Sequence, residues 1–352
     1  MDNKRKNSFS ARKTVLSVLC VFLSVVLILM LGGTIYMESL LRKINRVETS
    51  TTGATLSSSE VQDILNGQNE TVDPNYTGAT MSAEDVTWAP DVTEPIGQGE
   101  NVINILLIGQ DRRPGEVRAR SDAMILCTVN KEKKTLTLTS IMRDLYVQIP
   151  GYSDDRINVC YVFGGMPLLN ACIEKNFGVV VDGNVEVDFS GFETVVDLVG
   201  GLEIELSKAE ASHLNSQNSY WSLKAGTNHL DGAQALAYSR IRSVSNDEAG
   251  DFGRTGRQRI VLSKLVQKAK TMSLLQLNDM LTKVLPTLTT DLTDAEIFKY
   301  LVDLFPLLVD LEINTARIPA DGAYFMTMID GKSVLVPDLE VNREILKEIV
   351  SP

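Results

Sequence analysis

The sequence predicts an α/β fold in which a mixed central β-sheet is sandwiched between α-helical layers, preceded by one transmembrane helix. Wholly apolar runs such as NVINILLIG at 101–109 are typical of strands that are covered on both faces. These runs alternate with segments of helical periodicity, which favours a sheet between two helical layers. The uncharged run Thr14–Met37 has 24 residues, and ~20 suffice to cross a bilayer.

The N-terminal residues predict the orientation of this membrane span. Basic residues precede it, namely Lys4, Arg5, Lys6, Arg12 and Lys13. The positive-inside rule therefore places a cytoplasmic head at 1–13 and residues 38–352 outside the cell membrane. A cleaved signal peptide is the alternative, but its apolar core is usually shorter and no A-x-A-like cleavage site follows. The head is too short to hold a DNA-binding fold.

Charge and cysteine content exclude several classes of protein. The formal net charge of −11 argues against nucleic acid as a partner, since nonspecific binding needs a basic surface. Outside the span lie three cysteines, Cys127, Cys160 and Cys172, so a disulfide scaffold is not expected. Cys160 and Cys172 either pair or serve as small buried apolar residues.

Composition divides the exported part into three regions. Residues 38–100 are rich in Ser, Thr, Pro and Gly, which predicts an extracellular stalk that buries little apolar surface. The domain core is expected at 101–270. Residues 271–352 predict a C-terminal α/β extension that packs on this core.

Elements of the core follow from local patterns. After the strand at 101–109, the runs 122–130 and 134–142 are separated by a short charged turn and predict a hairpin. Capping boxes predict helix starts at Ser190 with Glu193 and at Asp231 with Gln234. The other expected elements are helices at 167–178, from about Phe252 to Met272, at 292–305 and at 339–350, and strands at 184–189, 202–206, 311–320 and 333–338.

Two carboxylates flank the loop GQDRRPGEVRARSDA. Asp111 ends one predicted strand and Asp122 begins the next. If the two strands are neighbours, both carboxylates face one small volume. Hard oxygen donors with few other protein ligands suit Mg²⁺, which takes its remaining ligands from water and substrate phosphates. The alternative is that Asp122 caps a turn and Asp111 pairs with a nearby arginine, and the spacing does not choose between the two.

An arginine cluster in this acidic chain indicates a shaped anion site. In GDFGRTGRQR, Arg254, Arg257 and Gln258 share one helix face at i, i+3 and i+4. That face continues into a buried stripe, and it lies near a helix N-terminus, which favours anions. Few acidic residues flank Arg254 and Arg257 in the sequence. Asp251, just before the helix, is a candidate for its N-cap.

The motifs NILLIGQDRR, RSDAMIL, TLTSIMRDLY, NVEVDFSGF and GDFGRTGRQR occur in this order between about Asn101 and Lys270. In this order they resemble the LytR-CpsA-Psr family of cell-wall ligases, which also carry an N-terminal anchor. The family transfers glycopolymers such as wall teichoic acid or capsule from a polyprenyl pyrophosphate carrier to peptidoglycan. One departure is Gln110, where the family often has a small residue, and residues 271–352 match only loosely.

The resemblance implies roles for individual residues. It implies that Asp111 and Asp122 hold Mg²⁺. It implies that the pyrophosphate is surrounded by Arg120, Arg143, Arg240, Arg242, Arg254, Arg257 and Gln258. The residues expected to be catalytic are Asp122, Arg143, Arg242 and Arg254.

These roles predict a mechanism of transfer, but they leave open which carboxylate is the base and whether transfer is the reaction. Metal and arginines would neutralise charge on the leaving polyprenyl phosphate as a muramic-acid hydroxyl attacks. Asp122 or Asp144 would accept the hydroxyl proton. A polyprenyl tail needs an apolar tunnel, so the core between sheet and helices should be open. The alternatives are a hydrolase of the same lipid pyrophosphate and a non-catalytic envelope regulator that binds lipid-linked intermediates.

Overall fold

A computed structural model describes residues 36–47, 80–110, 120–244 and 250–351. Two compact units are distinguished, Met1–Ile44 and Asn45–Pro352. In the first, residues 36–41 are helical. Within the described ranges, no helix is long and apolar enough to cross a membrane. The predicted span at 14–37 lies outside these ranges apart from its last two residues.

The second unit is built on a mixed sheet, as the sequence predicts. Its seven described strands have the order β1-β10-β7-β2-β3-β4-β11. They are β1 (Asn45–Arg46), β2 (Val102–Gln110), β3 (Ser121–Asn130), β4 (Thr135–Ile141), β7 (Gly183–Val187), β10 (Leu288–Thr290) and β11 (Glu312–Ile318). The strands β2, β3 and β4 are antiparallel, whereas β7 runs parallel to β2 and β11 parallel to β4.

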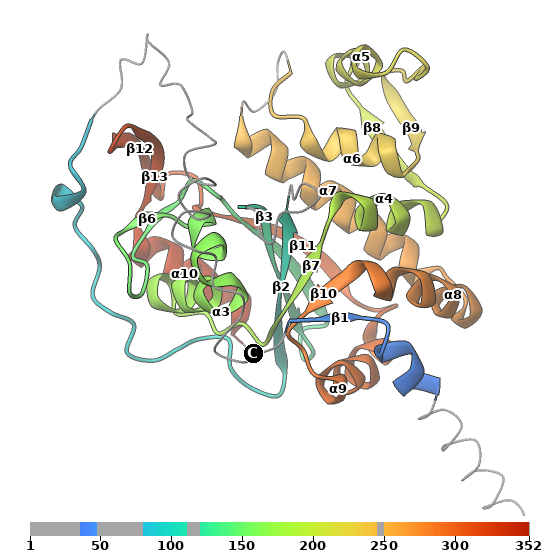
Figure 1. Ribbon diagram of the computed structural model, residues 1–352, viewed down its shortest axis with the longest axis horizontal. Coiled ribbons are helices and arrows are strands. Elements are labelled where there is room, and N and C mark those ends of the chain that lie inside the picture. The colour runs from blue at the N-terminus through green and yellow to red at the C-terminus, as the bar shows by residue number, and fades with distance from the viewer. Residues whose placement is uncertain (1–35, 48–79, 111–119, 245–249, 352) are drawn as a thin grey trace, which may run out of the picture. The chain divides into compact units, whose positions relative to one another are not determined.

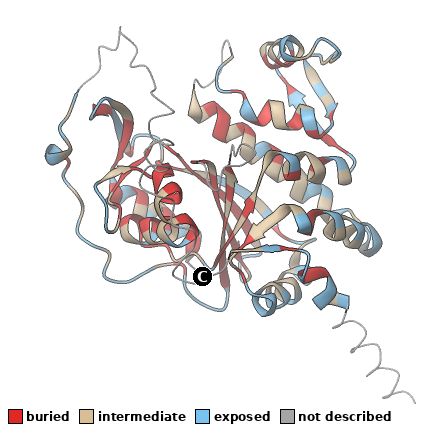
Figure 2. Cartoon of the chain, viewed as in Figure 1, coloured by how far each residue is buried: buried red, intermediate tan, exposed pale blue. Residues whose placement is uncertain are grey.

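Helices cover both faces of this sheet (Figure 1). Because side chains alternate along a strand, Leu106 and Ile108 of β2 pack on one side, against α3 (Asn158–Phe177) and α10 (Leu339–Val350). Ile105 and Leu107 point to the other side, which carries α7 (Asp251–Lys270) and α9 (Asp294–Leu304). The central strands are therefore mostly buried (Figure 2), which explains their uninterrupted apolar sequence.

The remaining elements surround this core. The helices are α4 (Phe189–Leu198), α5 (Lys208–Gln217), α6 (Gly232–Arg240) and α8 (Leu274–Val284), and the 3₁₀ turns are η1 (Ala83–Asp85), η2 (Leu285–Thr287) and η3 (Phe305–Leu307). Three small antiparallel pairs are β5 (Tyr146–Val147) with β6 (Asp155–Arg156), β8 (Leu202–Leu206) with β9 (Gly226–Leu230), and β12 (Tyr324–Ile329) with β13 (Lys332–Pro337). A second hydrophobic cluster joins α4, α5, α6, α7 and β8.

Helix starts test the capping predictions. The capping box of Asp231 and Gln234 at the start of α6 is confirmed. The predicted box of Ser190 and Glu193 is wrong, because α4 starts earlier and Asp188 is its N-cap, accepting from the Gly191 amide at 2.8 Å. The N-cap of α7 is Gly250, so the N-cap role considered for Asp251 is wrong as well.

The helix predicted at 167–178 is the second half of a longer one. Its end at Gly178 is confirmed, where a φ of 76° favours glycine. The helix α3 begins at Asn158, and Gly165 kinks it with a φ of 64°, two residues before Pro167. Glycine and proline usually mark the end of a helix, so the sequence did not predict the half of α3 that precedes Pro167.

The central sheet extends across the predicted domain boundaries. Its strands β10 and β11 come from the region predicted as an extension, 271–352, and pair with β7 and β4. Its strand β1 comes from the region predicted as a stalk, 38–100, and pairs with β10. Residues from all three predicted regions therefore contribute strands to one sheet.

Candidate functional site

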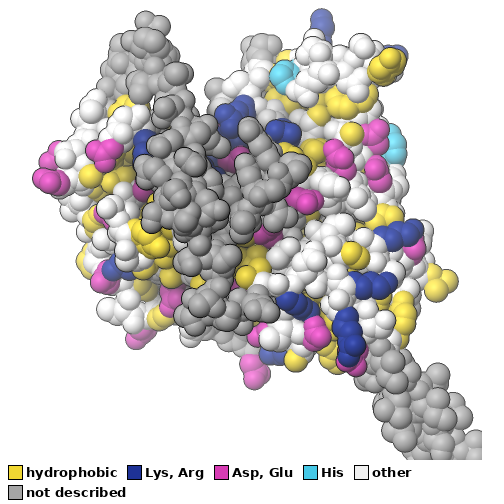
Figure 3. Space-filling view, viewed as in Figure 1, with side chains coloured by type: hydrophobic (Ala, Val, Ile, Leu, Met, Phe, Trp, Pro, Cys, Tyr) yellow, Lys and Arg dark blue, Asp and Glu magenta, His cyan; other side chains and the backbone are white. Residues whose placement is uncertain are grey.

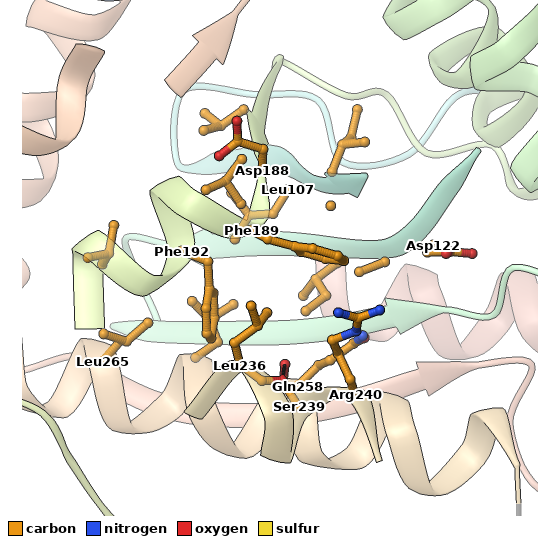
Figure 4. Close-up of a pocket in the computed structure, with 18 of the residues that line it drawn as sticks. Leu107, Asp122, Asp188, Phe189, Phe192, Leu236, Ser239, Arg240, Gln258 and Leu265 are labelled. Atoms are coloured by element: carbon orange, nitrogen blue, oxygen red, sulfur yellow. Dashed lines mark hydrogen bonds between the residues drawn. The ribbon is translucent and has the colours of Figure 1, made fainter. Parts of the chain in front are cut away.

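A cavity of about 480 Å³ lies between the sheet and the helices α4, α6, α7 and α8. Most of its wall is apolar, with Phe189 and Phe192 of α4, Leu236 of α6 and Leu265 of α7 among the lining residues (Figure 4). An open core between the sheet and these helices is what the sequence predicts for a protein that holds a polyprenyl tail.

One end of the cavity is polar. Its lining includes Asp122, Arg240, Arg242, Arg254 and Gln258. Figure 4 shows Asp122 and Arg240 at one end, with Phe192 and Leu265 toward the other. Basic side chains also gather on the surface over α6 and α7 (Figure 3). The cavity therefore combines an apolar tunnel with a cationic end, which suits a molecule with an anionic head and an apolar tail.

The strands β2 and β3 bring the candidate metal ligands to one edge of the sheet. They are antiparallel neighbours, and Gln110 at the end of β2 pairs with Ser121 at the start of β3. Asp122 follows in β3 and lines the cavity. Asp111 follows Gln110 in the sequence but lies outside the described residues. The condition that the two strands are neighbours is therefore met.

Asp251 connects the arginines of the cluster. Its Oδ2 lies 2.5 Å from Arg143 Nε and 3.1 Å from Arg254 Nη2, and its Oδ1 lies 3.8 Å from Arg242 Nε. The carboxylate stands in the first turn of α7, where the helix dipole also favours negative charge. One carboxylate thus contacts three guanidinium groups, which come from different parts of the chain.

Asp122 joins the same cluster from the sheet. Its Oδ1 accepts from Arg143 Nη1 at 2.8 Å, and its carbonyl oxygen accepts from Arg254 Nη2 at 3.2 Å. Arg254 is only 5% exposed, yet its Nε has no hydrogen-bond partner among the described residues, and neither has Gln258 Oε1. Buried polar atoms are normally paired, so these two atoms have unused capacity for a ligand at the polar end.

Electrostatics couple the carboxylates and arginines. Burial alone would lower the pKa of Arg143, but the carboxylates of Asp144, Asp251 and Asp122 raise it. Burial would raise the pKa of Asp251, but Arg254 and Arg143 lower it. Burial raises the pKa of Asp144 to about 6, with the charge of Asp251 adding to it and that of Arg143 opposing it. Burial lowers the pKa of Arg254, and the charge of Asp251 opposes this. The shifts of Arg143 and Asp251 both favour their charged forms at neutral pH.

Arg257 lies apart from the cavity. Its Nε donates to Glu210 Oε1 at 2.8 Å, its Nη1 donates to the Ile241 carbonyl at 3.1 Å, and its guanidinium lies over the Tyr238 ring. Burial would raise the pKa of Glu210, but hydrogen bonds from Ser207 and Arg257 lower it. The scarcity of acidic residues beside Arg257 in the sequence is thus misleading, because its partner Glu210 lies 47 residues away.

The sequence carried a signal for Glu210 that the prediction did not use. Ser207 and Glu210 form a capping box at the start of α5, a helix that was not predicted at all. Another omission is Arg156, whose Nη1 lies 3.3 Å from Asp144 Oδ1. Of the other predicted arginines, Arg240 lies over the Phe189 ring at the cavity wall, whereas Arg120 is buried and is not among the described lining residues.

The described residues fit a divalent cation in part. They contain no group of three His, Cys, Asp or Glu side chains arranged to hold a metal. Asp122 lines the polar end of the cavity, and its Oδ1 accepts from Arg143 Nη1. The second carboxylate of the predicted pair, Asp111, lies outside the described residues. Two carboxylates with few other protein ligands are the kind of donor set that Mg²⁺ accepts together with water and phosphate oxygens.

Comparison with known proteins gives consistent matches. The LytR_cpsA_psr family model matches residues 56–349. A Bacillus cereus protein named polyisoprenyl-teichoic acid–peptidoglycan teichoic acid transferase TagU is 35% identical over 222 residues, 62% of this chain and 69% of the relative. A protein of the same name from Bacillus anthracis is 33% identical over 266 residues, 73% of this chain and 84% of the relative.

Solved structures agree with these matches. TagT bound to LIIa-WTA superposes with a TM-score of 0.60 at 28% identity, over 75% of this chain and 97% of that one. A LytR-CPS2A-psr family protein, YwtF (TagT), with bound octaprenyl pyrophosphate lipid superposes with a TM-score of 0.57 at 25% identity, over 76% of this chain and all of that one.

Proposed function

The chain belongs to the LytR-CpsA-Psr family, and from that premise we propose that it transfers a glycopolymer of the wall teichoic acid class from a polyprenyl pyrophosphate carrier to peptidoglycan. The observation that carries the proposal is the cavity with one apolar and one cationic end. Relatives named as polyisoprenyl-teichoic acid–peptidoglycan teichoic acid transferases, and a similar structure with bound octaprenyl pyrophosphate, support it. A capsule polymer is the other glycopolymer that this site would accept.

The residues at the polar end would bind the pyrophosphate. Arg254, Arg242 and Arg240 supply positive charge at the cavity wall. Arg254 Nε and Gln258 Oε1, which have no hydrogen-bond partner in the described part of the chain, supply a donor and an acceptor. As the acceptor hydroxyl attacks the phosphorus next to the sugar, charge develops on the leaving polyprenyl phosphate. Arginines already fixed by Asp251 stabilise that charge without first having to reorganise.

Asp122 is the described carboxylate that faces the reacting phosphate in this proposal. With Asp111 it would hold Mg²⁺, which would neutralise pyrophosphate charge when bound. Arg143 fixes Asp122 through the 2.8 Å contact and is largely buried, so we assign it to positioning as well as to charge stabilisation. Asp144, the other candidate base, is not among the described lining residues and pairs with Arg156. We therefore place Asp144 with the residues that orient Arg143.

We also propose that the span Thr14–Met37 anchors the chain in the cell membrane, with residues 38–352 on the outer side. The basic head and the uncharged run support this topology. A reporter that works only outside the cytoplasm should be active when it is fused after residue 352. Activity of a cytoplasm-specific reporter at that position would contradict the topology.

The transfer itself is tested with full-length protein in vesicles, lipid-linked donor and peptidoglycan fragments. A covalent glycopolymer–peptidoglycan product, together with release of polyprenyl phosphate, is expected. Release of free glycopolymer without the covalent product would indicate the hydrolase alternative, and donor binding without any release would indicate a regulator. Arg254→Ala should abolish the product, while Lys268→Ala, at an exposed position of the same helix, should not.

A further inference from the structure

The helix α9 is apolar on two faces. One face carries Tyr300 and Leu304 and, with Leu307 of η3, packs on the hydrophobic cluster beneath the sheet. The opposite face and the turn after it carry the residues defined here as the α9 stripe: Phe298, Val302, Phe305 and Val309. A surface helix of a soluble domain usually has one apolar face, so this second face calls for a partner.

The α9 stripe is exposed in the structure. Its side chains are 44%, 57%, 50% and 70% exposed in chain order. Phe298 and Val302, which are four residues apart, lie on one side of α9, and Phe305 and Val309 follow in η3 and in the turn after it. Single exposed apolar residues are common on protein surfaces, but a contiguous row of them marks an interaction site.

The chain enters the second unit beside this helix. The strand β1 begins this unit at Asn45 and pairs with β10. Arg46 forms an ion pair with Asp294, the first residue of α9, and donates to the carbonyl of Leu292 just before it. The start of α9 is therefore fixed to the point at which the polypeptide arrives from the N-terminal region.

The connection to the predicted membrane span is short. Seven residues, 38–44, separate Met37 from Asn45, and an extended chain spans at most about 3.5 Å per residue, or about 25 Å in total. Helical residues at 36–41 shorten this reach, because a helix rises only about 1.5 Å per residue. The α9 stripe begins four residues after Asp294 and ends at Val309, five residues after the end of α9. The whole stripe is thus within reach of the bilayer that would hold the span.

We propose that the α9 stripe inserts into the outer surface of the phospholipid bilayer in which this chain is anchored. Phenylalanine and valine side chains on a helix that lies along the interface enter the boundary between head groups and acyl chains. The domain is then held at the membrane by two points, the span and α9. This inference rests on the predicted span and is independent of the transfer reaction, and it goes beyond that reaction by assigning a membrane-docking surface.

Depth-sensitive fluorescence quenching tests the proposal in the full chain. Phe305→Trp places a reporter in the stripe, and Tyr152→Trp is the matched control. Tyr152 is 52% exposed, close to the 50% of Phe305, and it stacks on Phe163 of α3 across the sheet from α9. Each variant is reconstituted into phosphatidylcholine vesicles with or without dibrominated acyl chains, and the signal of Trp88 and Trp221 in the unsubstituted chain is subtracted.

Bromolipid should quench the added tryptophan of Phe305→Trp several-fold more than that of Tyr152→Trp. Equal quenching of the two variants would overturn the proposal. Absence of bromolipid quenching together with concentration-dependent crosslinking through α9 would overturn it in favour of a second copy of the chain on the stripe. Failure of the unsubstituted chain to float with the vesicles would also overturn it, because the tether would then be missing.

Discussion

Arg143 and Asp251 lie 108 residues apart in the sequence, and Arg143 Nε stands 2.5 Å from Asp251 Oδ2. The contact joins the end of β4 to the first turn of α7. Because Arg143 also holds Asp122, it links the edge of the sheet to the helix that carries Arg254. The polar end of the cavity therefore depends on a chain of charged contacts between elements distant in sequence.

Asp251→Asn should destabilise the protein and abolish transfer. The variant keeps the side-chain volume but leaves the largely buried Arg143 and Arg254 without their shared carboxylate. Breaking a buried ion pair on one side costs about 3–5 kcal/mol, which a denaturant titration measures. Asp279→Asn is the control, because its pair with Lys283 is exposed and should contribute less than about 1 kcal/mol. Equal effects of the two substitutions would contradict the role of Asp251.

Arg254→Ala and Arg257→Ala should behave differently toward ligand. A polyprenyl pyrophosphate at a hundredfold excess over its dissociation constant should stabilise the unsubstituted protein by ~2.7 kcal/mol. Arg254→Ala should lose most of this gain. Arg257→Ala should lower stability in the absence of ligand, because it leaves Glu210 unpaired, but should retain the gain. Thermal melts with and without ligand measure both quantities. Loss of the gain in Arg257→Ala would show that Arg257 contributes to pyrophosphate binding after all.

Asp122→Asn should weaken the dependence of turnover on Mg²⁺. The amide keeps an acceptor oxygen for Arg143 but removes the negative charge that an ion needs, and Asp111→Asn should have the same effect. Chelation should stop turnover of the unsubstituted enzyme, and added Mg²⁺ should restore it. Asp188→Asn is the control, because Asp188 also lines the cavity but serves as the N-cap of α4, a role that asparagine fills equally well. An identical Mg²⁺ titration for Asp122→Asn and the unsubstituted enzyme would refute the assignment.

Asp144→Asn should change the pH dependence of stability. The pKa of Asp144 is raised from 3.8 to about 6, so the folded state binds more protons than the unfolded state between these values. Its contribution to stability is full below pH ~4 and is lost as the pH rises through about 6. The asparagine variant should match the unsubstituted protein near pH 4 and exceed it above pH ~7 by up to about 3 kcal/mol. Denaturant titrations across this range measure the difference, and a constant offset would contradict the raised pKa.

Leu265→Trp should select against donors with long lipid tails. Leu265 lies toward the apolar end of the cavity (Figure 4), where a larger side chain fills space that a tail would occupy. Transfer from a long-chain donor should fall at least about tenfold, by the roughly 1.4 kcal/mol that a factor of ten represents, while a short-chain donor should still react. Ile260→Trp is the control on the exposed side of the same helix. Equal losses with both donors would show that the tail does not reach this end.

Local sequence patterns correctly predicted the central strands and the long helix α7. In these elements the pattern of burial stays the same from one end to the other, so it leaves a regular pattern of apolar residues. Apolar runs are covered on both faces in β2, β3 and β4, and α7 keeps one buried side. The start of α4 was predicted less accurately. Asp188 and Ser190 are both residue types that favour the N-cap position, and tertiary packing decides between them. The helix α5 was missed because its apolar residues are few.

The sequence predicted which residues form the candidate site but not which of them pair with one another. The arginines and Asp122 were recognised from motifs, and Arg254, Arg242, Arg240 and Gln258 do lie together at the cavity. The pairing of Arg257 with Glu210, 47 residues away, and the central position of Asp251 arise from tertiary packing. The sequence shows only which charged residues flank one another along the chain. It does not show which distant charged residues tertiary packing brings into contact.

The order in which the sheet is completed constrains how this chain folds during synthesis. The strands β7 and β4 remain sheet edges until β10 at 288–290 and β11 at 312–318 leave the ribosome. Every residue of the cationic cluster has been synthesised by then, so the catalytic half exists first with two unprotected strand edges. Open edges invite pairing with other chains, and pairings distant in sequence form slowly. A stop codon near position 270 should therefore yield an aggregating fragment instead of a smaller enzyme.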